Sequence, residues 1–212
     1  MKNTLIIGAS GQIGKQLTQL MLDDKQHVTA LVRDKDKLSD INNENLTIVE
    51  EDLTDNFEKA FKHCDNVVFV AGSGGNTGAD KTLLIDLWAA CRAADYAKAN
   101  NIEHFVMVSS IGAGDPSEGP EDMQPYLVAK HMADEHLKRS GLHYSIIRPG
   151  TLTNDEATEK FTTERESLKS DQFTITRADV AHALLFCINN PPKVSAITEI
   201  FNGSKSIGEA LK

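Results

Sequence analysis

Tyr126 and Lys130 are four residues apart, a spacing that places a phenol and an ammonium group on the same face of a helix. A nearby cation lowers the pKa of a phenol by favouring the phenolate, and such a tyrosine can pass a proton near neutral pH. The same spacing also arises by chance on helices, as a packed ring beside a solvated lysine. The pair therefore predicts proton transfer only in combination with other features of the chain.

Three glycines, Gly8, Gly11 and Gly14, follow an apolar run at residues 4–7. The run predicts a buried central strand, and the apolar spacing of residues 13–21 predicts a helix directly after the turn. Gly8 would allow a sharp turn, Gly11 a close approach of the backbone to a ligand, and Gly14 tight packing of the helix on the strand. Free N–H groups at the helix start favour a pyrophosphate, so we expect a dinucleotide site here, with a purely structural turn as the alternative.

Polar residues also follow the next two predicted strands. Arg33 ends the strand at residues 27–32, nineteen residues past the last glycine of the turn. At this place an arginine accommodates a 2′-phosphate, whereas an acid binds the ribose 2′-hydroxyl. We therefore expect NADP, while Asp34 at the next position would favour NAD. Asp52 follows a strand at residues 46–49 and would either accept a hydrogen bond from the adenine amino group or serve as a turn aspartate.

Strands alternate with helices along the chain, which predicts an α/β fold with a parallel sheet and right-handed crossovers. Further strands are expected at residues 66–71, 104–108, 143–147 and 197–202, and further helices at 56–63, 80–99, 126–140 and 180–189. The apolar stripe of the long helix at 80–99 would consist of Leu83, Leu84, Leu87, Trp88 and Cys91. The loop after the fourth strand, at residues 72–75, should line the ligand cleft, and residues 155–171 should form a lid or an irregular segment.

Composition narrows the class of protein. The net charge of −9 argues against nucleic acid as a partner. Cys64, Cys91 and Cys187 are an odd number, far apart and in apolar stretches, so we expect reduced core residues rather than disulfides or a metal site. The N-terminal apolar run is too short for a signal peptide or a membrane span. We therefore expect a cytoplasmic protein, without a membrane partner, in one domain of 212 residues with about 150–212 on the substrate side.

The order of these motifs resembles the atypical short-chain dehydrogenase/reductases, the group of NmrA-like and biliverdin-reductase-B-like proteins. The similarity rests on the G-x-x-G-x-x-G turn, Val32-Arg33, Ser109-Ser110, the Tyr-x-x-x-Lys pair and Arg148-Pro149-Gly150, and it covers nearly the whole chain. It implies a Rossmann-type doubly wound sheet with helices on both faces and a small C-terminal substrate lobe. It also implies NADP as the cofactor, with NAD possible.

The resemblance also assigns roles to single residues. Tyr126 would donate or accept the proton, Lys130 would bond the nicotinamide ribose, and Ser110 rather than Ser109 would polarise a substrate carbonyl. Asp86 stands where the family has a catalytic asparagine, so it either changes the charge of the proton relay or faces solvent. The expected cofactor-binding residues are Gly8, Ser10, Gly11, Gln12, Ile13, Gly14, Arg33, Asp52, Leu53, Ala71, Gly72, Ser73, Lys130, Pro149 and Gly150.

We therefore expect an NADP-dependent oxidoreductase for a small carbonyl or quinone-like substrate, as a monomer or homodimer. A regulator that senses NADP(H) without turnover is the main alternative, because Asp86 and the acidic loop from Asp115 to Asp122 fit it. A nucleotide-sugar epimerase or dehydratase ranks lower, because the tail after Gly150 is short. An α/β domain without a nucleotide is the remaining option.

The position of Arg33 makes a prediction about cofactor choice. Replacing Arg33 with alanine should weaken NADP binding about tenfold or more and leave NAD binding nearly unchanged, because only NADP carries the 2′-phosphate. Calorimetric titration of both variants with both nucleotides measures this. An equal loss for NAD and NADP would contradict a phosphate contact.

Overall fold

The computed structural model describes residues 2–75 and 77–211. Its main sheet has eight strands in the order β3-β2-β1-β4-β5-β6-β10-β8, and every pair is parallel except β10 with β8. This is the expected doubly wound Rossmann-type sheet, in which the order reverses at β1 and β4. The strands are β1 (Asn3–Ile7), β2 (His27–Val32), β3 (Leu46–Glu50), β4 (Asn66–Phe69), β5 (His104–Val108), β6 (Tyr144–Pro149), β8 (Phe161–Thr162) and β10 (Ala196–Asn202).

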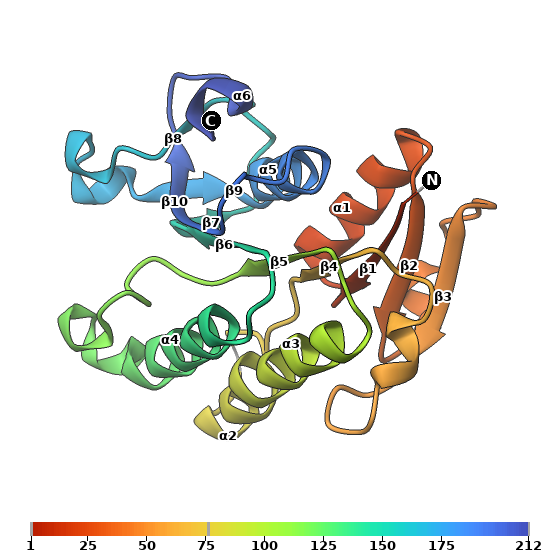
Figure 1. Ribbon diagram of the computed structural model, residues 1–212. Coiled ribbons are helices and arrows are strands. Elements are labelled where there is room, and N and C mark those ends of the chain that lie inside the picture. The colour runs from red at the N-terminus through yellow and green to blue at the C-terminus, as the bar shows by residue number, and fades with distance from the viewer. Residues whose placement is uncertain (1, 76, 212) are drawn as a thin grey trace.

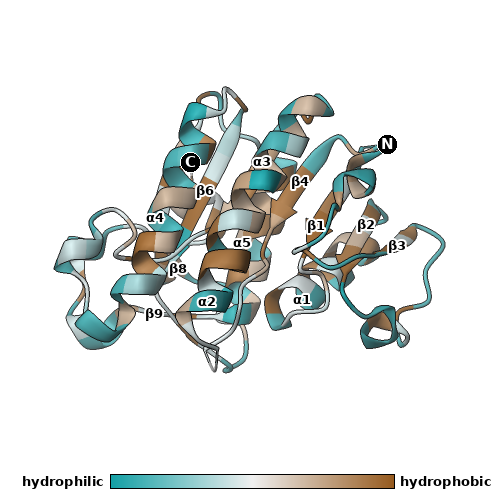
Figure 2. Ribbon diagram, turned by 90° about the horizontal axis from the view of Figure 1, so that it is seen from below, coloured by the Kyte–Doolittle hydropathy of each residue, from teal (hydrophilic) through white to brown (hydrophobic). Residues whose placement is uncertain are grey.

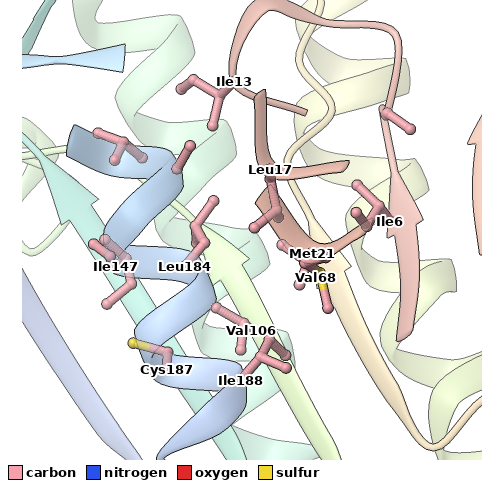
Figure 3. Close-up of a cluster of buried hydrophobic side chains, with 14 of the residues drawn as sticks. Ile6, Ile13, Leu17, Met21, Val68, Val106, Ile147, Leu184, Cys187 and Ile188 are labelled. Carbon is pink, nitrogen blue, oxygen red and sulfur yellow. The ribbon is translucent and has the colours of Figure 1, made fainter. Parts of the chain in front are cut away.

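Helices cover both faces of the sheet (Figure 1). On one face lie α1 (Gln12–Asp23) and α5 (Arg177–Asn189), and on the other lie α3 (Ala90–Ala99) and α4 (Gln124–Arg139). Successive side chains of a strand point to opposite faces, so the central strands need apolar residues throughout. Figure 3 shows the core on the α1 and α5 face, where Leu17 and Leu184 pack over Val68 and Val106.

The remaining elements are short. They are the one-turn helices η1 (Lys35–Leu38), η2 (Glu58–Phe61), η4 (Pro116–Glu118), η5 (Glu121–Met123), η6 (Arg165–Ser167) and η7 (Ser170–Gln172), the small sheet of β7 (Thr151–Thr153) with β9 (Thr174–Thr176), and α6 (Ile207–Ala210). The expectation that residues 155–171 have no regular structure is therefore wrong in part, because β8 pairs with the C-terminal strand β10. Such long-range pairing leaves no periodic signal in a two-residue strand.

The long helix expected at residues 80–99 has an unexpected centre. It consists of α2 (Ala79–Lys81), the π-helix η3 (Thr82–Ala89) and α3. The predicted apolar stripe is wrong for three of its five members, because Leu83 and Trp88 are 53% and 55% exposed and Leu84 is also exposed. In Figure 2 the segment between α2 and α3, which contains η3, is partly brown, that is, hydrophobic.

Small side chains form the buried face of this helix instead. Ala89, Ala93 and Ala97 are fully buried, and Leu87 and Cys91 are the two members of the predicted stripe that do pack inward. Alanine on the inner face lets the helix lie close to the sheet. Apolar periodicity alone does not predict that the alanines, rather than the larger apolar residues, face the sheet.

The three cysteines are buried and free, as expected. Burial raises the pKa of Cys91 to about 11 and that of Cys187 to about 12, so both are inert core thiols rather than nucleophiles. Across residues 2–75 and 77–211, no helix has the length and apolar character needed to cross a bilayer.

His104 and His143 form a pair at the amino-terminal end of the parallel strands, away from the glycine turn. This pair should lower the free energy of unfolding at acid pH. His104 accepts or donates a hydrogen bond with Ser145 (Nε2 to Oγ, 3.0 Å), and its ring stands 5.0 Å from that of His143. Its Nδ1 is buried without a partner among the described residues. Burial, helped by His143 and Lys2, lowers the pKa of His104 from 6.5 to about 4.

The free energy of unfolding should therefore be constant above about pH 6.5 and fall by a few kcal/mol between pH 6.5 and pH 4. In this range the unfolded chain binds a proton that the folded protein does not. Denaturant unfolding at a series of pH values measures the slope. His104→Gln should flatten it, whereas His63→Asn, at an exposed position, should leave it in place; an unchanged slope in His104→Gln would refute this origin.

Candidate cofactor-binding and active site

The glycine turn between β1 and α1 packs with almost no spare volume. Gly8 has a φ of +91°, and a Cβ at this position would lie 2.7 Å from the backbone of Ala71, which follows β4. A Cβ at Gly14 would lie 2.2 Å from the carbonyl oxygen of Gly8. The roles predicted for these two glycines, a sharp turn and tight helix packing, are thus confirmed.

The first turn of α1 is open to a ligand. Its N-cap is Gly11, no side chain caps the helix, and its first turn contains no acid. The N–H groups at the start of a helix and the positive end of its dipole favour an anion. Ser10, Gly11 and Gln12 line a cavity of about 550 Å³ at this point. Such a backbone cradle fits the diphosphate of a dinucleotide.

Arg33 and Asp34, which follow β2, have different surroundings. Asp34 caps η1, because its Oδ1 accepts a hydrogen bond from the amide of Asp36 at 3.1 Å, while Arg33 is exposed. Asp52 forms a turn in which Oδ1 accepts from the amide and the hydroxyl of Thr54, both at 2.8 Å. These bonds, with the charge of Arg33, lower the pKa of Asp52. Its turn role, one of the two expected alternatives, is therefore observed.

Asp86 points into the protein rather than to solvent. It is 2% exposed, and its Oδ2 accepts a hydrogen bond at 3.0 Å from the amide of Ser73 in the loop after β4. A Cβ at Gly72 would lie 3.1 Å from its Oδ1. The π-helix η3 thus directs a carboxylate at the loop that was expected to line the cofactor. The alternative of a solvent-facing aspartate is wrong.

Tyr126 lies in the first turn of α4. It is half-buried, and both Ser110 and the charge of Asp86 act on its phenol. Burial and Asp86 raise the pKa of Tyr126 to about 12, and Ser110 offsets only part of this. The expectation that Lys130 lowers the pKa of Tyr126 is wrong, because desolvation and a carboxylate outweigh the cation. The phenol of Tyr126 is therefore protonated at neutral pH.

Lys130 is buried one turn further along α4. Its Nζ donates to the carbonyl oxygen of Val108, at the end of β5, at 2.7 Å. Burial lowers its pKa, while the carboxylates of Asp86 and Asp134 act in the opposite direction. The structure thus brings the four expected catalytic residues to one place, and the ammonium is held there by main-chain oxygen and negative charge.

An ion pair of Asp134 with Arg148 lies beneath the site and was not predicted from the sequence. Asp134 is fully buried, and its Oδ2 accepts from Arg148 Nε at 3.0 Å, Arg148 Nη2 at 2.9 Å and Ser109 Oγ at 2.9 Å. Ser109 therefore faces inward and Ser110 faces Tyr126, which follows from the alternation of side chains at a strand end. The signal was present in the spacing of Tyr126, Lys130 and Asp134, each four residues apart on one face of α4.

The residues at the end of β6 lie at the same carboxyl edge of the sheet as the rest of the site. Pro149 and Gly150 are buried, and the carbonyl oxygen of Pro149 accepts from the amide of Ile111 at 3.1 Å. A Cβ at Gly150 would lie 2.6 Å from the carbonyl oxygen of Phe173. Of the remaining expected cofactor residues, Ala71 and Leu53 are partly exposed near the same edge and Ile13 is in the core.

Comparison with known proteins places this chain in a family. The profile of the NAD(P)H-binding family matches residues 8–191, and the chain belongs to this family. It is 37% identical over 211 residues to a protein of Bacillus subtilis (strain 168) named as an uncharacterized sugar epimerase, YhfK, covering 98% of this chain and 97% of that one.

Two further proteins are similar. A solved structure described as a putative NAD-dependent epimerase/dehydratase from Bacillus halodurans superposes with a TM-score of 0.91 at 38% identity, covering 99% of this chain and 98% of that chain. Sanguinarine reductase of Eschscholzia californica is 29% identical over 123 residues, covering 56% of this chain and 45% of the enzyme. The chain is therefore an atypical NAD(P)-binding protein of the short-chain dehydrogenase/reductase type, and reductases are among its relatives.

The position of Asp86 predicts an electrostatic effect on Tyr126. In Asp86→Asn the pKa of Tyr126 should fall from about 12 toward its ordinary value of 10, because a negative charge is removed while burial stays. Ultraviolet titration of tyrosinate, with Tyr126→Phe as the reference that lacks the signal, measures the shift. A titration curve identical to that of the wild type would show that Asp86 does not act on the phenol.

Proposed function

We propose that this protein is an NADP-dependent oxidoreductase that transfers a hydride between the nicotinamide and a small carbonyl or quinone-like substrate. The observation that carries the proposal is a protonated, half-buried Tyr126 on which Ser110 and the buried carboxylate of Asp86 both act, at the sheet edge where the glycine turn lies. The reductase among the relatives supports the same class of reaction.

The residues present fit a dinucleotide. At Gly8 and Gly14 the backbone leaves no room for side chains, so the turn can follow a diphosphate closely. Arg33 is exposed at the ribose position, and Asp34 is engaged in capping η1, which favours NADP over NAD. Lys130 would bond the nicotinamide ribose, and Pro149 and Gly150 would lie beside the nicotinamide.

The chemistry that follows is reduction. When bound, a reduced nicotinamide supplies the hydride. Tyr126 donates its phenolic proton to the carbonyl oxygen as the carbonyl carbon gains the hydride, so the C=O group becomes an alcohol. Ser110 orients the carbonyl through its hydroxyl group. The tyrosinate left behind regains its proton from solvent.

The reducing direction follows from the pKa of Tyr126. With a value of about 12, the phenol is protonated at neutral pH and serves as an acid. Alcohol oxidation would need the phenolate as a base, which the carboxylate of Asp86 disfavours. Asp86, at the position of the family's asparagine, thus biases the site toward carbonyl reduction.

Consumption of NADPH with a panel of carbonyl compounds and quinones tests this function. Tyr126→Phe should lower kcat by about 100-fold or more, because the general acid is lost. Tyr144→Phe, which removes a phenol at the amino-terminal end of β6, should leave kcat unchanged. Turnover that survives Tyr126→Phe would refute the role of the tyrosine.

Two other functions predict different results in the same assay. A regulator would bind NADP tightly and consume none with any member of the panel; the carboxylate of Asp86 in place of asparagine favours this alternative. An epimerase, the activity in the name of the Bacillus subtilis relative, would interconvert a sugar nucleotide without net consumption of cofactor. Part of the chain after Gly150 forms α5 and β10 of the main fold, which leaves fewer residues for a sugar-nucleotide pocket.

A further inference from the structure

The cavity over the glycine turn has a second wall that comes from the C-terminal part of the chain. One side is the first turn of α1, and the other side consists of Asn154, Asp155 and Glu156, with Arg177 of α5 beside them. The cavity volume is about 550 Å³. Residues more than 140 positions apart in the sequence thus enclose the place where a cofactor diphosphate would lie.

The second wall is a strap, residues 154–158, fastened at both ends to the first turn of α5. Arg177 Nη1 donates to Asn154 Oδ1 at 2.8 Å and to the carbonyl oxygen of Leu152 at 3.2 Å. At the other end the buried carboxylate of Asp179 accepts from the amide of Thr158 at 3.1 Å and from its hydroxyl at 2.9 Å. The strap is therefore held in place before any ligand arrives.

Arg177 is the cation on this wall, and part of its guanidinium has no hydrogen-bond partner among the described residues. A guanidinium has five N–H groups, and among the described residues only those of Nη1 have partners. Lys15 also lines the cavity, but its ammonium is bound to Asp40 at 2.8 Å and to the carbonyl oxygen of Lys37 at 3.3 Å. An anion in the cavity would therefore meet Arg177 first.

We propose that Arg177 binds the cofactor diphosphate from the side opposite the glycine turn, an inference that rests on the proposed nucleotide-binding function. A guanidinium matches the planar pair of oxygens on a phosphate. Because NAD and NADP share the diphosphate, this contact strengthens both, unlike a contact at Arg33. The strap also carries Asp155 and Glu156, two exposed carboxylates on the same wall that repel the diphosphate. Affinity is thus set by one attracting and two repelling groups.

Because Arg177 and the two carboxylates have opposite charges, replacing them should change nucleotide affinity in opposite directions. Calorimetric titration with NADP and with NAD should show about tenfold weaker binding of both nucleotides to Arg177→Gln, because a charged hydrogen bond is lost. The double variant Asp155→Asn/Glu156→Gln should bind both nucleotides a few-fold more tightly. Both changes should shrink as the salt concentration rises, since these side chains are at the surface of the cavity.

A third variant distinguishes the effect of the charge of Arg177 from the effect of its contacts with the strap. Asn154→Ala removes one strap contact of Arg177 and keeps its charge, so nucleotide affinity should stay within about twofold of the wild type. If Asn154→Ala weakens binding as much as Arg177→Gln does, and the double variant matches the wild type, Arg177 only positions the strap and the proposal is wrong. Thermal melting confirms that each variant is folded.

The outcome is distinct from that of the proposed function. A wild-type protein that binds neither nucleotide would overturn the nucleotide site and this inference together. A wild-type protein that binds NADP, with unchanged affinity in both Arg177→Gln and the double variant, would overturn the diphosphate contact alone.

Discussion

The steric contact between the glycine turn and the chain leaving β4 is the constraint on which the rest of the site depends. The backbone of Gly8 touches that of Ala71 so closely that no Cβ would fit between them. Two residues further on, the amide of Ser73 is bound by Asp86, whose charge in turn acts on Tyr126. The glycine turn and the phenol of Tyr126 are therefore linked by one continuous set of contacts.

Burial, more than any single charged neighbour, decides the protonation of this site. Two carboxylates and two cations meet beneath the carboxyl edge of the sheet, Asp86 and Asp134 with Lys130 and Arg148. Charges out of water are tolerated when they are paired and hydrogen-bonded, and Arg148 and Ser109 supply this to Oδ2 of Asp134, while its Oδ1 is buried without a partner among the described residues. Burial, together with the charges of Asp86 and Asp134, keeps the phenol of Tyr126 protonated at neutral pH.

The fold alone leaves the reaction open, because the same doubly wound sheet serves relatives named for epimerase and for reductase activity. What distinguishes chemistries is the set of groups at the carboxyl edge and what closes over it. Here the closing part is the strap fastened to α5 by Arg177 and Asp179, a short segment in place of a larger substrate domain.

By itself, the sequence determined most strands and helices of the Rossmann-type sheet, the glycine turn and the pair of Tyr126 and Lys130, because these depend on local periodicity, glycine geometry and spacing along one helix. Only the tertiary structure decided which face of residues 80–99 is buried, where Asp86 points and how strongly Tyr126 holds its proton. It also decided that a strap from residues 154–158 meets the glycine turn. These properties arise from packing and desolvation between segments far apart in the chain, for which a linear pattern of residues carries no signal.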